Sequence, residues 1–178
     1  PRYQADLSYL GTYAEDRQPM LEALLLQPAQ QQPNRTFLIA GAQYPEQLAL
    51  PPNVKLLPHV PPPHHPAFYN SARLNLSITR AAMAHMGYCP SGRLFEAAAC
   101  QAPILTDYWE GLDTFFEPDR EILIAHNTED VLDALKRDDL QKIATHARHR
   151  VLSQHTAQHR AEQLEALLTS TPVLTGAN

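Results

Sequence analysis

The chain has 178 residues, of which 44% are hydrophobic and 19% are charged, and its 14 Lys and Arg against 19 Asp and Glu give a formal net charge of -5. This length and composition fit one ordinary folded domain and exclude a disordered segment, a disulfide-stapled miniprotein and a coiled coil. Clustered basic residues, which nucleic-acid binding requires, are not evident in so acidic a chain. No apolar run reaches the roughly 18 to 20 residues that cross a bilayer.

The first residues suggest where the protein works. The chain starts at Pro1, with neither an initiator Met nor the apolar core of a signal peptide. We therefore expect a cytoplasmic location and a chain that is a piece of something larger. The two cysteines agree with a reducing compartment: Cys100 lies in an alanine-rich run and is expected to pack as a small apolar side chain, and Cys89 has no neighbouring His that would make it a nucleophile.

Short apolar runs alternate with longer periodic ones, which predicts strands alternating with helices. The strands are expected at 7–10, 36–40, 54–57, 74–78, 103–106 and 121–125. The helices are expected at 17–27, at 67–70 as a brief turn, near 91–99, from a capping Thr128, at roughly 139–152 and at about 155–168. We expect Pro28 to end the first helix, and the proline-rich residues 58–66 to form a stiff connection without a regular helix.

This order of elements predicts an α/β fold: a Rossmann-like, three-layer α/β/α domain with a roughly six-stranded parallel sheet. The domain is expected to span 3–170, followed by a flexible tail at 171–178. Parallel sheets of this kind bind ligands outside the carboxyl ends of their strands. Candidate binding residues are therefore sought in the loops after residues 10, 40, 57, 78 and 106.

The first of these loops contains Gly11 and Thr12, and Arg17 opens the following helix. Glycine lets a backbone approach a ligand closely, and an arginine near helix amides suits a phosphate. The alternative, a tight turn with a solvated arginine, remains open, because the sequence contains neither a dinucleotide-binding glycine motif nor a phosphate-binding Walker loop.

Ser91 and Gly92 place free backbone amides at a second helix start, where an anion can bind. Glu96 follows on the same helix, among apolar residues. A carboxylate there is costly to bury unless it accepts hydrogen bonds, and sugar hydroxyls are natural donors. A salt bridge from Glu96 to Arg93 or Arg80 is the competing interpretation.

Several separated motifs carry a family resemblance. They are residues 93–104 (RLFEAAACQAPI), 107–116 (DYWEGLDTFF), 10–13 (LGTY), 16–18 (DRQ), 40–45 (AGAQYP) and 65–70 (HPAFYN). Together they resemble the donor-binding C-terminal half of two-domain GT-B glycosyltransferases, and more narrowly the CgeB-like (spore maturation protein) branch. The similarity extends from about Asp6 to Leu168.

The resemblance implies a nucleotide-sugar site with a role for each candidate residue. It implies Glu96 at the ribose, and His59 and Val60 at the base. It implies contacts to the diphosphate from Gly11, Thr12, Arg17, Ser91 and Gly92. It implies Arg80, Tyr88 and Pro90 on the donor-sugar side. Many retaining relatives carry a second Glu eight positions before the ribose Glu, where this chain has Tyr88, so retention or inversion stays open.

A metal site is a further alternative, because the chain has nine histidines. His146 and His149 are spaced to share a helix face, but arginines are interleaved with them, which favours solvated helix faces. The resemblance implies neither a metal nor a cofactor, only the donor substrate. Lys142, Arg148 and Arg150, with Arg160, make the C-terminal helices locally basic; we expect a solvated face, or else contact with a partner domain or a membrane surface.

These observations predict a glycosyltransferase of hexosyltransferase-like type, with this chain as the half that binds a nucleotide-diphosphate sugar. The acceptor would be held by an N-terminal domain of the same enzyme, and the fragment alone would have little activity. The alternatives are a noncatalytic nucleotide- or protein-binding Rossmann-like module and a metal-sensing domain.

Overall fold

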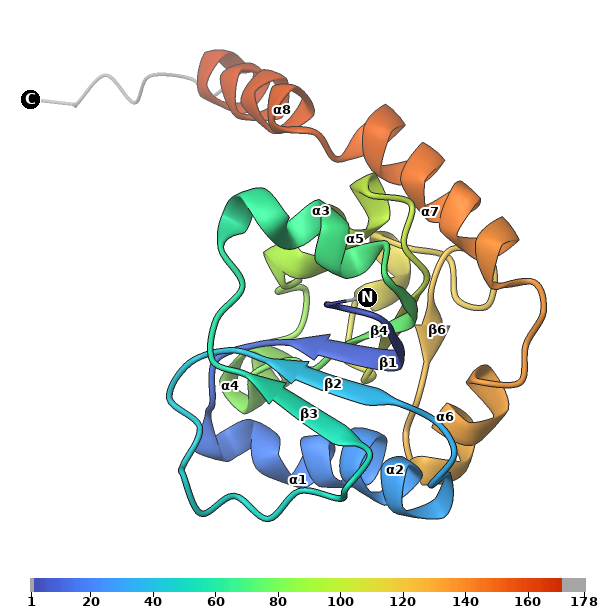
Figure 1. Ribbon diagram of the computed structural model, residues 1–178. Coiled ribbons are helices and arrows are strands. Elements are labelled where there is room, and N and C mark those ends of the chain that lie inside the picture. Colours follow the sequence, from blue (N-terminus) through green and yellow to red (C-terminus); the bar gives the residue numbers. More distant parts are fainter. Residues whose placement is uncertain (1, 171–178) are drawn as a thin grey trace, which may run out of the picture.

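The protein, described here by a computed structural model over residues 2–170, is built around one six-stranded parallel sheet (Figure 1). The strands are β1 (Ala5–Leu10), β2 (Phe37–Ala40), β3 (Val54–Leu57), β4 (Ala72–Ser77), β5 (Ile104–Thr106) and β6 (Leu123–Ile124). Their order across the sheet is β3-β2-β1-β4-β5-β6. The strands β2 and β3 therefore lie on one side of β1, and β4, β5 and β6 lie on the other. The predicted α/β fold with about six parallel strands is confirmed.

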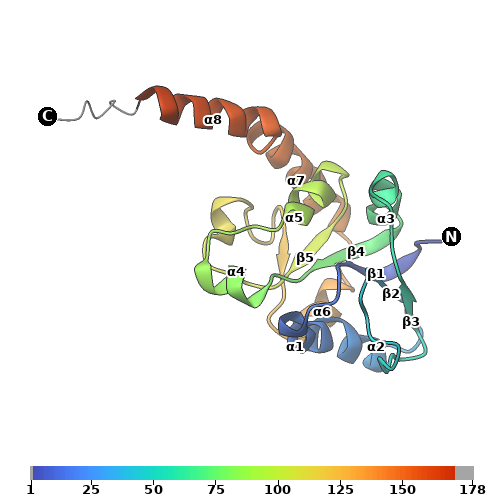
Figure 2. The same cartoon turned by 90° about the vertical axis from the view of Figure 1, so that its left-hand side faces the viewer.

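Helices cover both faces of the sheet (Figure 2). The α-helices are α1 (Gln18–Leu21), α2 (Gln27–Gln31), α3 (His65–Tyr69), α4 (Ala81–Met86), α5 (Gly92–Ala99), α6 (Thr128–Ala134), α7 (Leu140–Gln154) and α8 (Ala157–Ser170). One apolar core lies between the sheet and the segments α1, α2 and α6, and a second lies between the sheet and α3, α5 and α7. Two such cores are expected for a three-layer domain, because a parallel sheet must bury both faces.

The strand register brings the loops of the first half to one edge. Leu10 pairs with Ala40, and Ala40 pairs with Leu57, so β1, β2 and β3 end level with one another. Hydrogen bonds from the Gly11 amide to the Ala40 carbonyl (2.8 Å) and from the Gly41 amide to the Leu57 carbonyl (2.9 Å) extend the pairing into the loops. The arrowheads in Figure 1 point to this carboxyl edge, and Figure 2 looks onto it.

The first helical segment passes through Pro28 instead of ending there. A π-helical turn, Glu22–Leu26, lies between α1 and α2, and the Gln27 amide donates to the Glu22 carbonyl, five residues back. Proline breaks an α-helix because it lacks an amide and its ring meets the carbonyl four residues back. The wider π turn disturbs that ladder just before Pro28, which lets the helix continue to Gln31.

Three other boundaries differ from expectation. The helix α3 begins at His65, because Pro66 lies in its first turn, where no amide is needed. The helix α4 was not predicted, since its six residues give too short a period to read. The cap of α6 is Asn127, whose side-chain oxygen accepts from the Asp130 amide (3.1 Å), and not Thr128. The expected flexible tail at 171–178 lies outside the described residues.

Candidate functional site

A pocket of about 200 Å³ opens at the carboxyl edge, beyond the ends of β1, β2 and β3. Its wall combines backbone from the three loops with two histidines and one arginine. The lining residues are Leu10, Gly11, Thr12, Ala40, Gly41, Ala42, His59, Val60, Pro62, His65 and Arg93. The structure thus brings together four of the residues expected at a nucleotide, Gly11 and Thr12 from one loop and His59 and Val60 from another.

Two glycines shape one side of this pocket by letting two loops touch. A Cβ placed on Gly41 would lie 1.9 Å from the Gly11 carbonyl oxygen and 3.0 Å from the Thr12 amide nitrogen. The Gly11 carbonyl also accepts a hydrogen bond from the Tyr44 hydroxyl (3.1 Å). Only glycine at position 41 leaves room for this backbone contact, which fixes the position of the Gly11 loop.

Arg17 supports the same loop from behind. Its side chain is buried, and its Nη1 donates to the Tyr9 hydroxyl (2.9 Å) and to the Thr12 carbonyl (3.4 Å). The alternative of a solvated arginine is therefore wrong, because Tyr9 and the loop enclose the guanidinium. Arg17 is not among the residues that line the pocket.

Arg93, a residue not assigned to the site from the sequence, supplies the pocket's guanidinium. It lies in the first turn of α5, and its amide donates to the Ser91 side chain (3.4 Å), which caps the helix. Within residues 2–170 the Arg93 guanidinium has no carboxylate partner. Open space surrounds Gly92, where an added Cβ would meet no atom within 4 Å. An unpaired arginine beside an accessible helix N-terminus favours an anionic ligand.

Glu96 lies one turn further along α5, half-exposed beside the pocket. Its Oε2 accepts a hydrogen bond from the Tyr69 hydroxyl (3.3 Å) and lies 3.6 Å from Nδ1 of His65. The expected salt bridge alternative is wrong in both forms for the described residues: Arg93 has no acidic partner, and Arg80 pairs with Asp16 (2.8 Å).

The three residues expected at a donor sugar lie apart from this pocket. Arg80 joins the loop after β4 to the loop after β1, since Asp16 also accepts from the Ala81 amide (2.8 Å); the Arg80 hydrogen bond lowers the pKa of Asp16. Tyr88 has a positive φ of 50°, donates its amide to the Glu110 carbonyl (2.7 Å), and packs its ring against Gly111. Pro90, like these two, is not among the residues lining the pocket.

A second hollow of about 310 Å³ lies at the same edge, beyond β4, β5 and β6. Asp107 is buried in its wall, where its carboxylate accepts from the amide (3.0 Å) and hydroxyl (2.8 Å) of Thr79. Burial raises the pKa of Asp107, and the Thr79 hydrogen bonds oppose that shift. Asp16 and His126 also line this hollow. None of the described residues that line it is an arginine, so it suits a phosphate less well than the pocket at Arg93.

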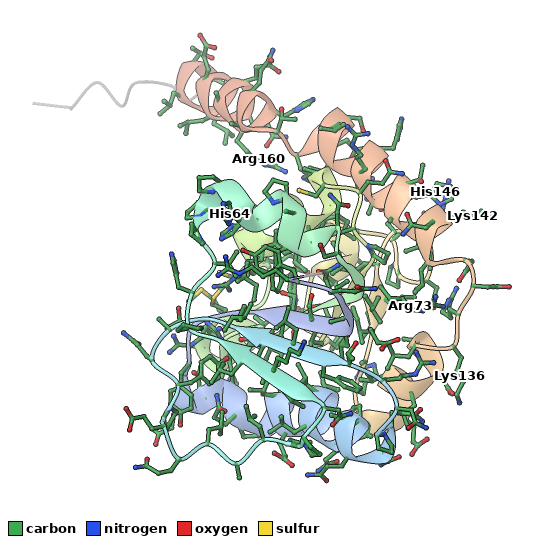
Figure 3. All side chains as sticks on the ribbon, viewed as in Figure 1. His64, Arg73, Lys136, Lys142, His146 and Arg160 are labelled. Atoms are coloured by element: carbon green, nitrogen blue, oxygen red, sulfur yellow. The ribbon has the colours of Figure 1, made fainter. Side chains whose placement is uncertain are left out.

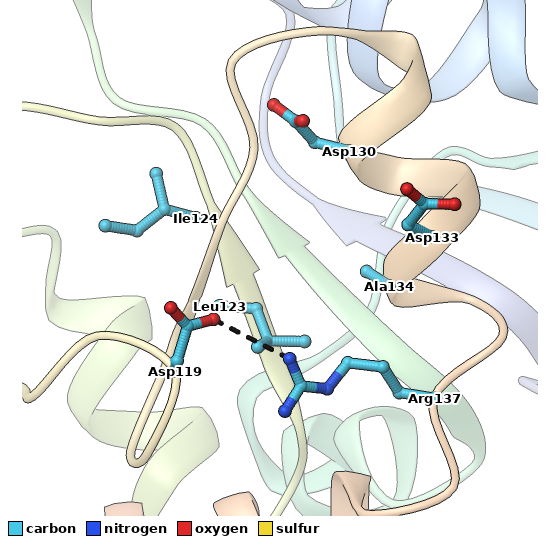
Figure 4. Close-up of a pocket in the computed structure, with 7 residues that line it drawn as sticks. All are labelled: Asp119, Leu123, Ile124, Asp130, Asp133, Ala134 and Arg137. Atoms are coloured by element: carbon cyan, nitrogen blue, oxygen red, sulfur yellow. Dashed lines mark ion pairs between the residues drawn. The ribbon is translucent and has the colours of Figure 1, made fainter.

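A third pocket, of about 230 Å³, lies between β6 and α6 (Figure 4). Asp119, Asp130 and Asp133 line it together with Arg137, which lies 3.6 Å from Asp119 and is already held by Asp139 through two hydrogen bonds of 2.8 Å. Three carboxylates against one engaged arginine repel a phosphate. This pocket is therefore not a candidate for an anionic ligand.

The histidines and arginines of α7 mostly bind the domain itself. Arg150 donates to the Phe115 carbonyl (3.0 Å) and lies 3.4 Å from Glu121, and Arg148 donates to the Ala99 carbonyl (3.2 Å). His146, labelled on α7 in Figure 3, contacts the Arg120 carbonyl (3.2 Å). The expected solvated face agrees with Arg148, which is exposed, but not with Arg150, which is partly buried and donates to the Phe115 carbonyl.

Residues 2–170 contain neither a metal-binding cluster nor a membrane-spanning helix. No group of three His, Cys, Asp or Glu side chains there is placed to hold a metal ion. No helix in this range is both long and apolar enough to span a membrane. Both cysteines are unpaired and partly buried, and burial, with the nearby Glu96 charge, raises the pKa of Cys100, which keeps that thiol protonated.

Comparisons with known structures agree with the fold. The chain is similar in structure to sucrose-phosphate synthase from Thermosynechococcus elongatus (TM-score 0.73, 16% identity, 95% of this chain and 46% of that one). HepE from Anabaena, solved with UDP-glucose, matches with a TM-score of 0.73 and 16% identity, over 94% of this chain and 49% of that one. The glucosyltransferase BGT of phage T4, solved with its UDP-glucose substrate, matches with a TM-score of 0.70 and 15% identity, over 93% of this chain and 48% of that one. The chain spans about half the length of each of these proteins, and the fold it shares with them is that of a GT-B glycosyltransferase domain.

Sequence comparison identifies the family. Among curated proteins, none is significantly similar to the chain in sequence. The family described as glycosyl transferase-like, however, matches residues 17–166, which is most of the chain and includes Arg17, Arg93 and Glu96. The chain therefore belongs to the glycosyl transferase-like family.

Proposed function

We propose that the chain is the donor-binding half of a glycosyltransferase and binds a nucleotide-diphosphate sugar in the pocket at the carboxyl edge. The observation that carries the proposal is Arg93, which has no carboxylate partner among residues 2–170 and lines the pocket with the Gly11 loop beside the open N-terminus of α5. Two of the similar structures were solved with UDP-glucose, which supports a donor of this class.

The pocket suggests a role for each group. The diphosphate would lie between Gly11 and Thr12 on one side and Ser91, Gly92 and Arg93 on the other, where amides and a guanidinium balance its charge. Arg17 would act through the Thr12 carbonyl that it holds.

The nucleoside would continue from the diphosphate. The base would lie along His59 and Val60, and the ribose would reach Glu96. Arg80, Tyr88 and Pro90 would face the donor sugar from beyond the pocket.

Transfer itself would need a second domain. The similar proteins are about twice as long as this chain, which supports an acceptor-binding N-terminal domain. We therefore expect the chain alone to bind donor with little transfer of a hexose, and its relatives to include the CgeB-like branch. We also expect a cytoplasmic protein. Contact with a membrane surface is the alternative to solvent or a partner domain for the basic side chains of α7 and α8.

A titration tests donor binding. UDP, GDP and ADP, each with its glucose conjugate, are titrated calorimetrically into the wild type and into Arg93→Gln. Loss of charge-assisted hydrogen bonds should weaken binding of the preferred nucleotide by about tenfold or more. Arg73→Gln is the matched control, because Arg73 lies at the start of β4 on the opposite edge of the sheet (Figure 3). Absence of binding to every nucleotide, or equal binding by Arg93→Gln and wild type, would exclude this site.

The second candidate is a noncatalytic nucleotide- or protein-binding module. It is favoured by Tyr88, which occupies the position where many retaining relatives have a Glu and which turns its backbone toward Glu110. A longer protein that contains this domain distinguishes the two functions. Nucleotide binding without hydrolysis or transfer of any donor sugar by that protein would favour the module.

A further inference from the structure

One face of α3 is directed at Glu96. His65 and Tyr69 are four residues apart on this helix, and both approach the same carboxylate oxygen. The Tyr69 hydroxyl donates to Oε2 at 3.3 Å, and Nδ1 of His65 lies 3.6 Å from Oε2, an ion pair when the imidazole is protonated. The other oxygen, Oε1, has no protein partner within residues 2–170.

Tyr69 is suited to hold a carboxylate permanently. Its side chain is buried, and burial, with the charge of Glu96, raises the pKa of its hydroxyl. The hydroxyl therefore remains a protonated donor throughout the neutral range. Glu96 itself is 53% exposed, so its free oxygen faces solvent and can meet a ligand.

His65 also reaches the base side of the pocket. Its Nε2 lies 3.2 Å from the Val60 carbonyl and, because a carbonyl only accepts, carries a proton. His65 therefore attracts Oε2 of Glu96 as the imidazolium, in which Nδ1 carries the second proton. One imidazole thus connects the loop that would face the base with the carboxylate that would face the ribose. His65 is also part of the pocket wall.

We propose that His65 and Tyr69 are positioning residues that hold Oε2 of Glu96, so that Oε1 is presented to the ribose hydroxyls and the site prefers a ribonucleotide. This inference rests on the proposed donor function. It assigns the selection of ribose to α3 as well as to Glu96, since a carboxylate free to rotate would make weaker hydrogen bonds with the hydroxyls.

The test is the ratio of two dissociation constants, for 2′,3′-dideoxy-UDP and for UDP, with the guanosine or adenosine pair in their place if those diphosphates bind more tightly. In the wild type, loss of both ribose hydroxyls should raise the dissociation constant by about tenfold or more. In His65→Gln with Tyr69→Phe, the ratio should fall to about threefold or less, close to that of Glu96→Gln. His64→Gln is the matched control, because the neighbouring His64 contacts the Tyr3 hydroxyl (3.2 Å) and not Glu96 (Figure 3).

The ratio separates positioning from general damage. A merely structural role would weaken both nucleotides equally and leave the ratio at its wild-type value, which would overturn the proposal while the donor site stands. If the double variant fails to fold by urea denaturation, Tyr69→Phe alone is measured, and it too must lower the ratio. Failure of the wild type to bind any nucleoside diphosphate would remove the donor function, and this inference with it.

Discussion

Substitution of Gly41 by alanine tests whether the contact between the two glycine loops builds the pocket. The added Cβ would lie 1.9 Å from the Gly11 carbonyl oxygen and 2.5 Å from the Gly11 carbonyl carbon. Both are backbone atoms, so no change of side-chain rotamer relieves the clash. The loops must separate by more than about 1 Å to reach an ordinary contact distance.

The cost follows from this forced movement. Overpacking of a well-packed site destabilises proteins by about 1–3 kcal/mol. For a domain of this size, each kcal/mol lowers the melting temperature by roughly 2–4 °C. Gly41→Ala should therefore lower the urea midpoint and the melting temperature measurably. It should also weaken nucleotide binding, because Gly11 and Thr12 move away from Arg93 across the pocket.

Gly92→Ala is the matched control. Its Cβ would meet nothing within 4 Å, and alanine is the better helix former, so this variant should be as stable as the wild type or slightly more stable. The assay is urea denaturation followed by circular dichroism, with the free energy of unfolding compared at equal m-values. A Gly41→Ala protein with the stability and nucleotide affinity of the wild type would refute the argument that the loops are in fixed contact.

Three further changes test other parts of the structure. Arg17→Met should lower the free energy of unfolding by about 1–3 kcal/mol, because it leaves the buried Tyr9 hydroxyl without its donor; an unchanged urea midpoint would contradict the buried arrangement. Asn127→Ala should lower the free energy of unfolding by about 1 kcal/mol in the same assay, because the cap on the Asp130 amide is lost. An unchanged free energy of unfolding would show that Asn127 does not cap α6 in solution. Burial raises the pKa of Asp107 above 3.8, so the protonated carboxyl is favoured by folding. Its contribution to stability is fully present below the unfolded pKa and is lost as the pH rises through the folded pKa. Relative to Asp107→Asn, the wild type should thus lose stability between acid and neutral pH in urea titrations, and a difference independent of pH would show that Asp107 does not titrate this way.

The fold and half of the candidate site could be predicted from the sequence because both depend on local patterns. Apolar runs and their punctuation located the six strands, and the rule that parallel sheets bind ligands at their carboxyl ends selected the loops of Gly11 and His59. The choice of arginine could not be predicted in this way. Arg17 and Arg93 each lie near the start of a helical segment after a glycine, and only the position of Tyr9 in the folded sheet decides that Arg17 is buried.

Helix boundaries were wrongly predicted where the effect of one residue was offset by the local backbone geometry. Pro28 breaks a regular α-helix, but the preceding π turn, whose three leucines are buried in the core, cannot be recognised from the hydrophobic pattern. The partners of Glu96 were missed for a similar reason. Tyr69 precedes it by 27 residues, and a helix read as a brief turn gives no indication of which of its faces is turned toward α5.

Side-chain contacts hold the Gly11 loop, the Val60 segment and α5, and those from Tyr44 and Arg17 are made behind the pocket wall. Tyr44 holds the Gly11 carbonyl, Arg17 holds the Thr12 carbonyl, and His65 holds the Val60 carbonyl. Ser91 caps the helix that carries Arg93. The contacts of Tyr44, Arg17 and His65 use carbonyl oxygens as acceptors, which turns those carbonyls toward the protein and away from a phosphate that they would repel. The pocket is thus organised before a ligand arrives, so binding need not order these loops. Substitutions behind the wall should accordingly reduce affinity by misplacing backbone groups, even though the substituted side chains never touch the ligand.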